Sequence, residues 1–201
     1  MVLLAIDTSN RILSVALLTE DSRTFSKEKQ MERGQGEALI PLIQELFNES
    51  KEKIENLDAI AVAVGPGSFT GVRIGLACAK AFGLALNIPI FGVTNLEAEA
   101  YGISTPVTVV LDSKRGDYFV QHFDKGKATD EAHIESTDEL KKTLPFTAVG
   151  DAATELANTI GCQVIQPREP IAVAVAKIAL SRQNNPLPAQ PLYLRQADVT
   201  V

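Results

Sequence analysis

The chain has 201 residues, of which 45% are hydrophobic and 22% are charged, and these proportions are ordinary for a globular protein with a sizeable core. Its formal net charge is −6, it has no Trp, and its Lys and Arg residues form no clustered run. Nucleic-acid binding draws most of its affinity from cationic contacts with phosphates, and single strands also need aromatic stacking. The composition therefore argues against a disordered chain and against a protein that binds nucleic acid unaided.

The apolar segments of the chain are short. Residues 1–6 lead into a polar turn, which makes them too short for the hydrophobic region of a signal peptide or for a membrane span. Segment 74–86 is interrupted by Lys80 and is also shorter than a span. Cys78 and Cys162 are the only cysteines, and their small or apolar neighbours are typical of reduced thiols. We therefore expect a cytoplasmic protein with no membrane attachment and no disulfide.

The first half of the chain predicts a meander of strands followed by alternating helices and strands. Apolar runs separated by polar turns predict three antiparallel strands, and helical periodicity from Gly36 to Phe47 predicts a helix. Because Pro41 has no backbone N–H to donate, we expect the regular helix to begin close to it. The predicted elements are strands at 2–6, 12–19 and 23–29, a helix within 36–47, a strand at 58–64, a helix at 70–86 and a strand at 89–93.

The second half starts again with strands. We expect strands at 106–111, at 117–123 and near Ala132, helices at 138–143, 152–160 and 171–181, and an extended proline-containing segment at 184–191. The order of elements in the first half is that of half an actin-like or ribonuclease-H-like domain. The sequence thus predicts an α/β protein with an actin-like ATPase (ribonuclease-H-like) two-lobed fold. The first lobe is expected at 1–104, and a reduced second lobe with an extended tail at 105–201.

Asp7, Thr8 and Ser9 form a polar turn between the first two predicted strands. In actin-like ATPases such a turn cradles phosphates, and an acidic residue there helps to hold the metal ion. An Asx-type turn, closed by its own side chains, explains the same residues. Because no acidic partner stands at a recognisable spacing, we favour the closed turn and treat these three residues as a vestigial phosphate loop.

The peptide Gly-Pro-Gly-Ser-Phe-Thr-Gly at 65–71 joins a predicted buried strand to a predicted helix. Free backbone N–H groups at such a helix start can hold an anion. The peptide is not a P-loop, because no Gly-Lys-Ser/Thr follows, and Ser68 lacks the Gly-x-Ser-x-Gly setting of a nucleophile elbow. We favour tight turning, with Ser68 or Thr70 as the helix cap, over ligand binding.

Small residues recur at every fourth position of the helix predicted at 70–86: Gly71, Gly75, Ala79 and Gly83. A glycine inside a helix costs about 0.5–1 kcal/mol relative to alanine, so something must offset the cost. Close approach of another helix would do so, and the helix is apolar on its other faces as well. The sequence leaves open a neighbouring element of this chain or a second protein, and we favour a second protein.

Residue types needed for catalysis or metal binding stand in no supporting pattern. His122 and His133 are the only histidines, and neither belongs to a His-x-x-x-His or similar spacing. Residue order alone leaves a Ser-His-Asp triad open, but no serine has a supporting motif. We therefore expect no catalytic residue, no metal site and no cofactor.

The chain resembles the TsaB (YeaZ) family, the bacterial partners of the TsaD threonylcarbamoyl transferase. The most specific segment is 65–75, and the resemblance runs along essentially the whole chain. The segments that carry it are Leu-Ala-Ile-Asp-Thr-Ser at 4–9, Gly-Pro-Gly-Ser-Phe-Thr-Gly-Val-Arg-Ile-Gly at 65–75, Thr-Asn-Leu-Glu-Ala at 94–98, Leu-Asp-Ser-Lys-Arg-Gly-Asp at 111–117 and Pro-Leu-Tyr-Leu-Arg at 191–195.

This resemblance implies an actin-like fold and a non-catalytic scaffold that assembles with TsaD and the ATPase TsaE. Together these proteins place threonylcarbamoyl, supplied as an AMP conjugate, on the adenosine beside the anticodon of tRNAs that read A-starting codons. The family implies contact with tRNA only through the complex, and a homodimer when the protein is alone. At 33–37 the chain has Arg-Gly-Gln-Gly-Glu where many relatives have an Arg-His-Ser-Glu-like run.

Our hypothesis is therefore a helical interface for TsaD on the first lobe. The rival interpretations are an independent peptidase or ATPase, and a self-contained homodimer with a regulatory binding role. The residues expected at the interface are Leu39, Ile43, Leu46, Gly71, Ile74, Gly75, Ala79, Phe82 and Gly83.

Overall fold

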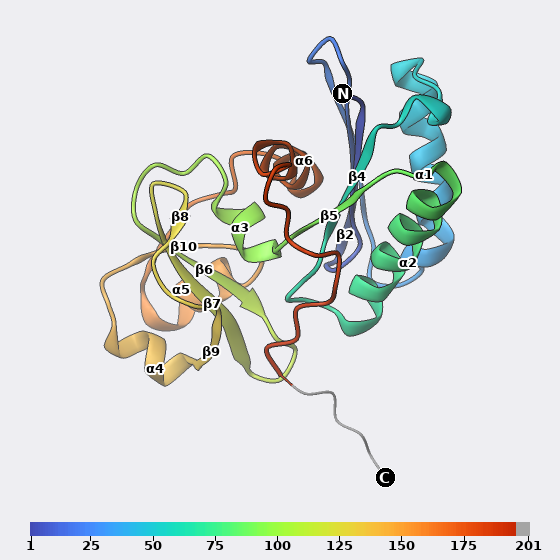
Figure 1. The fold of residues 1–201 in the computed structure, drawn as a ribbon. Helices are drawn as coiled ribbons and strands as arrows, with labels where there is room; N and C mark the ends of the chain where they lie inside the picture. Colours follow the sequence, from blue (N-terminus) through green and yellow to red (C-terminus); the bar gives the residue numbers. More distant parts are fainter. Residues whose placement is uncertain (196–201) are drawn as a thin grey trace.

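The computed structural model describes residues 1–195, which fold around two β-sheets (Figure 1). The first sheet has five strands in the order β3-β2-β1-β4-β5. β1, β2 and β3 form the predicted antiparallel meander, and β4 and β5 join β1 in parallel. The strands are β1 (Leu3–Asp7), β2 (Ile12–Leu18), β3 (Thr24–Gln30), β4 (Ala59–Ala63) and β5 (Ile90–Val93).

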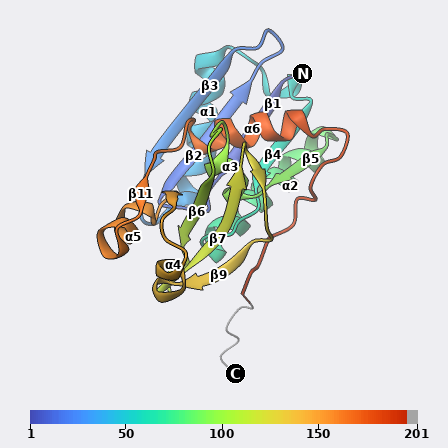
Figure 2. The ribbon, with the colours of Figure 1, turned by 90° about the vertical axis from the view of Figure 1, so that its left-hand side faces the viewer.

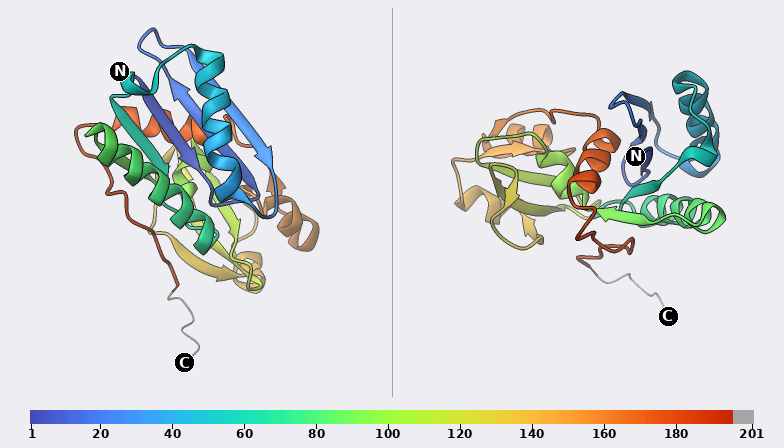
Figure 3. Two further views of the ribbon diagram at one scale, coloured as in Figure 1. Left: turned by 90° about the vertical axis from the view of Figure 1, so that its right-hand side faces the viewer. Right: turned by 45° about the horizontal axis from the view of Figure 1, so that its top comes forward.

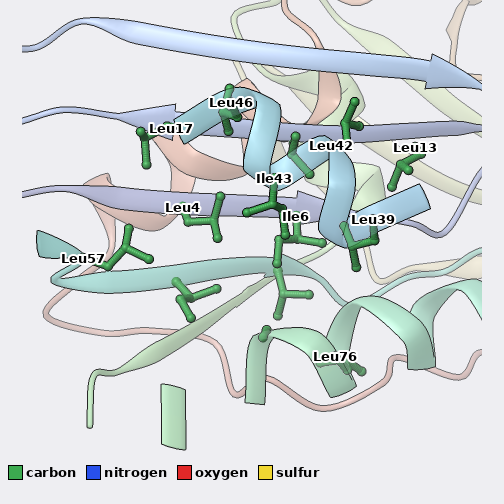
Figure 4. Packing of buried hydrophobic residues seen from close by; sticks show 14 of the residues in the cluster. Leu4, Ile6, Leu13, Leu17, Leu39, Leu42, Ile43, Leu46, Leu57 and Leu76 are labelled. Carbon is green, nitrogen blue, oxygen red and sulfur yellow. The ribbon is translucent and has the colours of Figure 1, made fainter. Parts of the chain in front are cut away.

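One face of the first sheet is covered by α1 (Gln35–Ser50) and α2 (Phe69–Leu86), which lie next to each other in the left view of Figure 3. Alternate residues of a strand point to opposite faces. Leu4 and Ile6 of β1 therefore point toward these helices and pack with buried α1 side chains such as Leu39 (Figure 4). A short 3₁₀ turn, η1 (Ile54–Asn56), leads from α1 to β4.

The opposite face of the first sheet is covered by α6 (Ile171–Ser181), near the end of the described chain. Leu3 and Ala5, which alternate with the α1-facing residues of β1, pack against its Ala- and Val-rich surface. Figure 3, right, places α6 between the two sheets. The helix predicted at 171–181 therefore exists, and it packs on the strands of the first lobe although it follows the second sheet in the sequence.

The second sheet has six strands: five follow the order β11-β10-β6-β7-β8, and β9 pairs with β7 outside this order (Figure 2). Its helices α4 and α5 lie on one face, and the short α3 lies on the other, toward α6. The strands are β6 (Val107–Asp112), β7 (Asp117–Asp124), β8 (Lys127–Ala128), β9 (His133–Ser136), β10 (Thr147–Val149) and β11 (Gln163–Val164), and the helices are α3 (Asn95–Ala100), α4 (Thr137–Lys142) and α5 (Ala153–Ile160).

The expected start of α1 near Pro41 is wrong. The helix begins at Gln35 and carries Pro41 inside it, on its exposed side. Proline removes only one backbone hydrogen bond, and burial of Leu39, Ile43 and Leu46 on the inner side holds the helix together across that position. The residues before proline are thus part of the helix that covers the sheet.

Candidate functional site

The Asp7 turn is closed by its own side chains and by neighbouring segments. Oδ1 of Asp7 accepts hydrogen bonds from the backbone N–H of Ser9 at 2.9 Å and from its hydroxyl at 2.6 Å. The hydroxyl of Thr8 donates to the carbonyl oxygen of Gly71 at 2.6 Å. All three turn residues are buried. Their polar groups form hydrogen bonds within the protein, as the interpretation of an Asx-type turn predicts.

Buried carboxyl groups lie beneath this turn. Oδ2 of Asp7 and Oε2 of Glu99 are buried and have no hydrogen-bond partner among the described residues. Desolvation raises the pKa of Asp7, although hydrogen bonds from Ser9 and Asn95 oppose it. Desolvation, with the negative charges of Asp151 and Asp7, raises the pKa of Glu99 to about 8. At neutral pH the Glu99 carboxyl is thus mainly in its protonated form.

Asn95, at the start of α3, links the turn to the loop after β4. Its side chain donates to the Ser9 hydroxyl at 2.7 Å and accepts from the Gly65 N–H at 2.9 Å. The N–H of Ser68 donates to the Ser9 carbonyl at 2.8 Å. In the sequence, segment 94–98 is distinctive only through the family resemblance, and nothing in its spacing reveals this buried connection.

The peptide 65–71 is a tight turn and a helix cap. The Ser68 hydroxyl accepts a hydrogen bond from the Gly71 N–H at 3.2 Å and so caps α2. A Cβ on residue 67 would lie 2.8 Å from the Ser9 carbonyl oxygen, so the loop backbone touches the Asp7 turn directly. The predicted cap at Ser68 is confirmed.

An open cleft of about 670 Å³ lies between loops of the first sheet and the turn that joins β6 to β7. Both signs of charge line it, and Lys114 pairs with Asp112 at 2.6 Å on the second-lobe side. Of the three buried turn residues, Ser9 lines the cleft, and Asp7 and Thr8 do not. The charged residues around the cleft are Arg11, Glu32, Arg33, Asp112, Lys114, Arg115, Asp151 and Arg195.

The C-terminal part of the described chain forms one wall of this cleft. The Leu192 N–H donates to the Val64 carbonyl at 2.8 Å, which fixes the segment to the end of β4. The ring of Tyr193 packs against that of Phe69 in a tilted arrangement, with centroids 5.3 Å apart. Arg195 pairs with Asp117 at the start of β7. The segment therefore connects the first lobe with the second.

The glycine ridge of α2 faces the protein's own interior, so its expected role in contacting a partner helix is wrong. A Cβ on Gly75 would lie 2.7 Å from the Thr8 hydroxyl oxygen, and one on Gly83 would lie 2.6 Å from the Ile90 side chain. Ala79 between them is fully buried. The close neighbours that offset the cost of these glycines are the Asp7 turn and β5, rather than a second protein.

Burial also removes the α1 residues from the expected interface. Leu39, Ile43 and Leu46 pack in the core against the sheet. Ile74 and Phe82 on α2 are half-buried and keep part of their surface at the edge of the helix pair. Periodicity identified the apolar stripes correctly, but it does not reveal which stripe the sheet covers.

The outer surface of α2 combines exposed apolar residues with the exposed cations Arg73 and Lys80, and other parts of the described chain do not cover it. By length and composition this helix could cross a membrane, yet one side packs on the sheet, and only 33% of it is buried. Leu84 is 86% exposed, and Ala77, Ala81 and Ala85 are exposed beside it. On α1, Ile40 is 48% exposed. We call the exposed residues Ile40, Ala77, Ala81, Leu84 and Ala85 the outer α1–α2 face.

A family model described as tRNA N6-adenosine threonylcarbamoyltransferase, TsaD, matches residues 29–184. The tRNA threonylcarbamoyladenosine biosynthesis protein TsaB of Bacillus subtilis is 36% identical over 122 residues, which are 59% of this chain and 53% of that protein. The chain thus spans about half the length of this curated relative. An uncharacterised protein of Mycobacterium tuberculosis is 28% identical over 97% of this chain and 92% of its own length.

Solved structures match the fold at lower identity. YeaZ from Pseudomonas aeruginosa superimposes with a TM-score of 0.78 at 23% identity, over 96% of this chain and 99% of that one. The ADPNP-bound activator of 2-hydroxyisocaproyl-CoA dehydratase from Clostridium difficile has a TM-score of 0.54 at 11% identity, over 94% and 99% of the two chains. The predicted actin-like ATPase fold is therefore confirmed. The chain belongs to the TsaD threonylcarbamoyltransferase family and, within it, to the TsaB (YeaZ) group.

Proposed function

We propose that this chain acts in threonylcarbamoyl modification of tRNA as a non-catalytic scaffold for a TsaD-like subunit. The relatives named for threonylcarbamoyladenosine biosynthesis support the pathway. In this proposal the TsaD-like protein carries out the transfer to the adenosine beside the anticodon. A TsaE-like ATPase joins the complex in the cytoplasm, and tRNA meets this chain only through the complex.

The observation that carries the scaffold proposal is the uncovered outer α1–α2 face. At 25 cal/mol per Å², burying a side chain the size of leucine contributes about 1.5–3 kcal/mol to the free energy of folding or binding. Because Leu84 is exposed, the isolated chain gains little of this free energy, and a partner that covered Leu84 would gain most of it. Apolar side chains on two neighbouring helices form a surface suited to helices of another protein. The interface thus moves from the buried glycine ridge to the opposite side of α2.

The Asp7 turn gives further support to a non-catalytic role. Oδ1 of Asp7 accepts hydrogen bonds from Ser9 within the turn. The Thr8 hydroxyl donates to the Gly71 carbonyl oxygen, and the Ser9 hydroxyl accepts from the Asn95 side chain. The Ser68 hydroxyl caps α2. A phosphate or metal ion at this turn would have to replace bonds that hold the strands, the loop and the helices together. We therefore expect no turnover when the pure protein is incubated with ATP or with casein.

The test compares two charge substitutions of exposed leucines on opposite faces of the first sheet. Leu84→Arg places a charge on the outer α1–α2 face, and Leu180→Arg does the same on α6, where Leu180 is 40% exposed. We expect Leu84→Arg to abolish co-purification with TsaD and Leu180→Arg to retain it, with both proteins folded by circular dichroism. Retained binding by Leu84→Arg would overturn the interface.

The same variants test the homodimer. Two copies of this chain can cover the same face, so light scattering should show a dimer for the isolated wild type and a monomer for Leu84→Arg. If TsaD uses this face, its addition should replace the homodimer with a heterodimer. A homodimer that persists beside an excess of TsaD would favour the self-contained regulatory protein instead.

A further inference from the structure

Strand pairing in the second sheet brings together side chains that the sequence keeps apart. β9 pairs antiparallel with β7, with Val120 opposite His133 and Tyr118 opposite Glu135. Directly opposed residues, and every second residue along each strand, share one face. His122, His133 and Glu135 therefore lie on the same face, and each offers one ligand atom within 4.8 Å of the other two.

Each imidazole has a partner at its Nδ1 atom, which is common among metal-bound histidines. Nδ1 of His122 is hydrogen-bonded to the buried Thr108 hydroxyl at 3.0 Å, and Nδ1 of His133 lies 2.8 Å from the Glu131 carbonyl oxygen. Such outer contacts fix the ring and its tautomer and leave Nε2 for the ion. In His133, Nε2 lies 2.8 Å from Oε1 of Glu135.

The contacts of His133 require a positive charge at this point. Both of its nitrogens face oxygen acceptors, so the ring needs either a second proton or a cation beside Nε2. The surroundings therefore stabilise positive charge.

The cluster has a carboxylate oxygen that could still bind a cation. Oε2 of Glu135 is buried and has no hydrogen-bond partner among the described residues. Oδ2 of Asp130 lies 3.5 Å from Nδ1 of His133 and 3.9 Å from Nε2 of His122, at the side of the cluster. A cation bound by the two Nε2 atoms and Glu135 would complete this set, with a water molecule or Asp130 in the fourth position.

We propose that His122, His133 and Glu135 form a binding site for a divalent transition-metal ion, with zinc as the best fit. Two imidazoles and a carboxylate suit zinc, whereas magnesium and calcium prefer oxygen ligands alone. The ion would fasten β9 to β7 on the second lobe, away from α1 and α2 (Figure 1). The spacing of the histidines predicted no metal site, because His122 and His133 come together through strand pairing and not through a short spacing in the sequence.

Zinc binding to the full chain tests the proposal, with the protein prepared without a polyhistidine tag. We expect titration calorimetry to show one Zn²⁺ per chain, and thermal unfolding to shift upward with added Zn²⁺. His122→Gln and His133→Gln should each lose the bound ion and the shift. Glu131→Gln is the matched control, because its exposed side chain lies outside the ligand set, and it should bind as the wild type does.

Circular dichroism distinguishes a variant that has lost a zinc ligand from one that does not fold. Circular dichroism of each metal-free variant should match that of the metal-free wild type. Thr108→Val, which removes only the hydrogen bond to His122, should weaken zinc binding by about 10–100-fold. Folded wild-type protein that takes up no Zn²⁺, or zinc binding unchanged in His133→Gln, as for an ion held by cysteine thiols, would overturn the proposal.

Discussion

The backbone of Gly71 lies directly against the backbone of Thr8: a Cβ on residue 71 would stand 2.2 Å from the Thr8 carbonyl oxygen. The Thr8 hydroxyl in turn donates to the Gly71 carbonyl oxygen at 2.6 Å. The first turn of the chain and the first turn of α2 are therefore one packed unit. This contact gives a structural reason for glycine at the start of the ridge, independent of any partner.

Replacing Gly71 with alanine should destabilise the folded chain. The new methyl group would meet backbone atoms, which cannot rotate away as a flexible side chain can. We expect a loss of at least about 2 kcal/mol in the free energy of unfolding, measured by urea denaturation.

Gly36→Ala is the control for this change. Its Cβ would meet only Ile74 Cδ1, at an ordinary 3.8 Å, and alanine favours the helix. The control should leave stability unchanged or raise it by up to about 1 kcal/mol. Equal stability of Gly71→Ala and the wild type would contradict the close packing of α2 on the Asp7 turn.

Replacing Asn95 with alanine should also weaken the fold. The change leaves the Gly65 N–H and the Ser9 hydroxyl without their present partner in a buried site. A buried polar group left unsatisfied costs about 1–3 kcal/mol, and urea denaturation measures the loss. Asn48→Ala, on the exposed side of α1, should change stability little. A similar, small effect in both variants would show that the Asn95 bonds do not hold the turn.

Stability should fall as the pH rises from about 5 to about 8, in part through Glu99. Its pKa is raised from 4.5 to about 8, so in this window the folded chain keeps a proton that the unfolded chain releases. Bound protons then favour the folded state, and their loss at higher pH destabilises it. Glu99→Gln removes the titration, so the free energy of unfolding should depend less steeply on pH and should exceed that of the wild type at pH 8.

Urea denaturation between pH 5 and pH 9 measures this dependence. Glu20→Gln, in an exposed turn, should retain the slope of the wild type. Parallel pH profiles for Glu99→Gln and the wild type would mean that the Glu99 carboxyl titrates alike in the folded and unfolded chains.

The local periodicity of apolar residues was sufficient to predict many of the strands and helices. Apolar runs predicted β1, β2, β4 and β6, and helical spacing predicted α2 and α6, because each of these elements buries a regular stripe. The short strands β10 and β11 were missed, since two or three residues carry no measurable period. The prediction from Pro41 put the start of α1 too late in the chain. Tertiary packing outweighed the single hydrogen bond that proline removes.

The candidate site was less accessible to sequence reasoning. The small residues at 71, 75, 79 and 83 correctly indicated a close contact, but a stripe of glycine fits a sheet of the same chain as well as a helix of another. Exposure of Leu84 depends on which side of α2 the sheet covers, and no local pattern contains this information. The division into lobes at 1–104 and 105–201 stays a prediction, and α6 crosses it by packing on the first sheet.

The most direct test of the scaffold role is a reconstitution of tRNA modification from TsaD, TsaE, threonylcarbamoyl-AMP and tRNA, with and without this chain. We predict that product forms with the wild type and with Leu180→Arg, and falls to the level without the chain when Leu84→Arg is supplied. Full modification in the absence of the chain, or with Leu84→Arg in its place, would contradict the account.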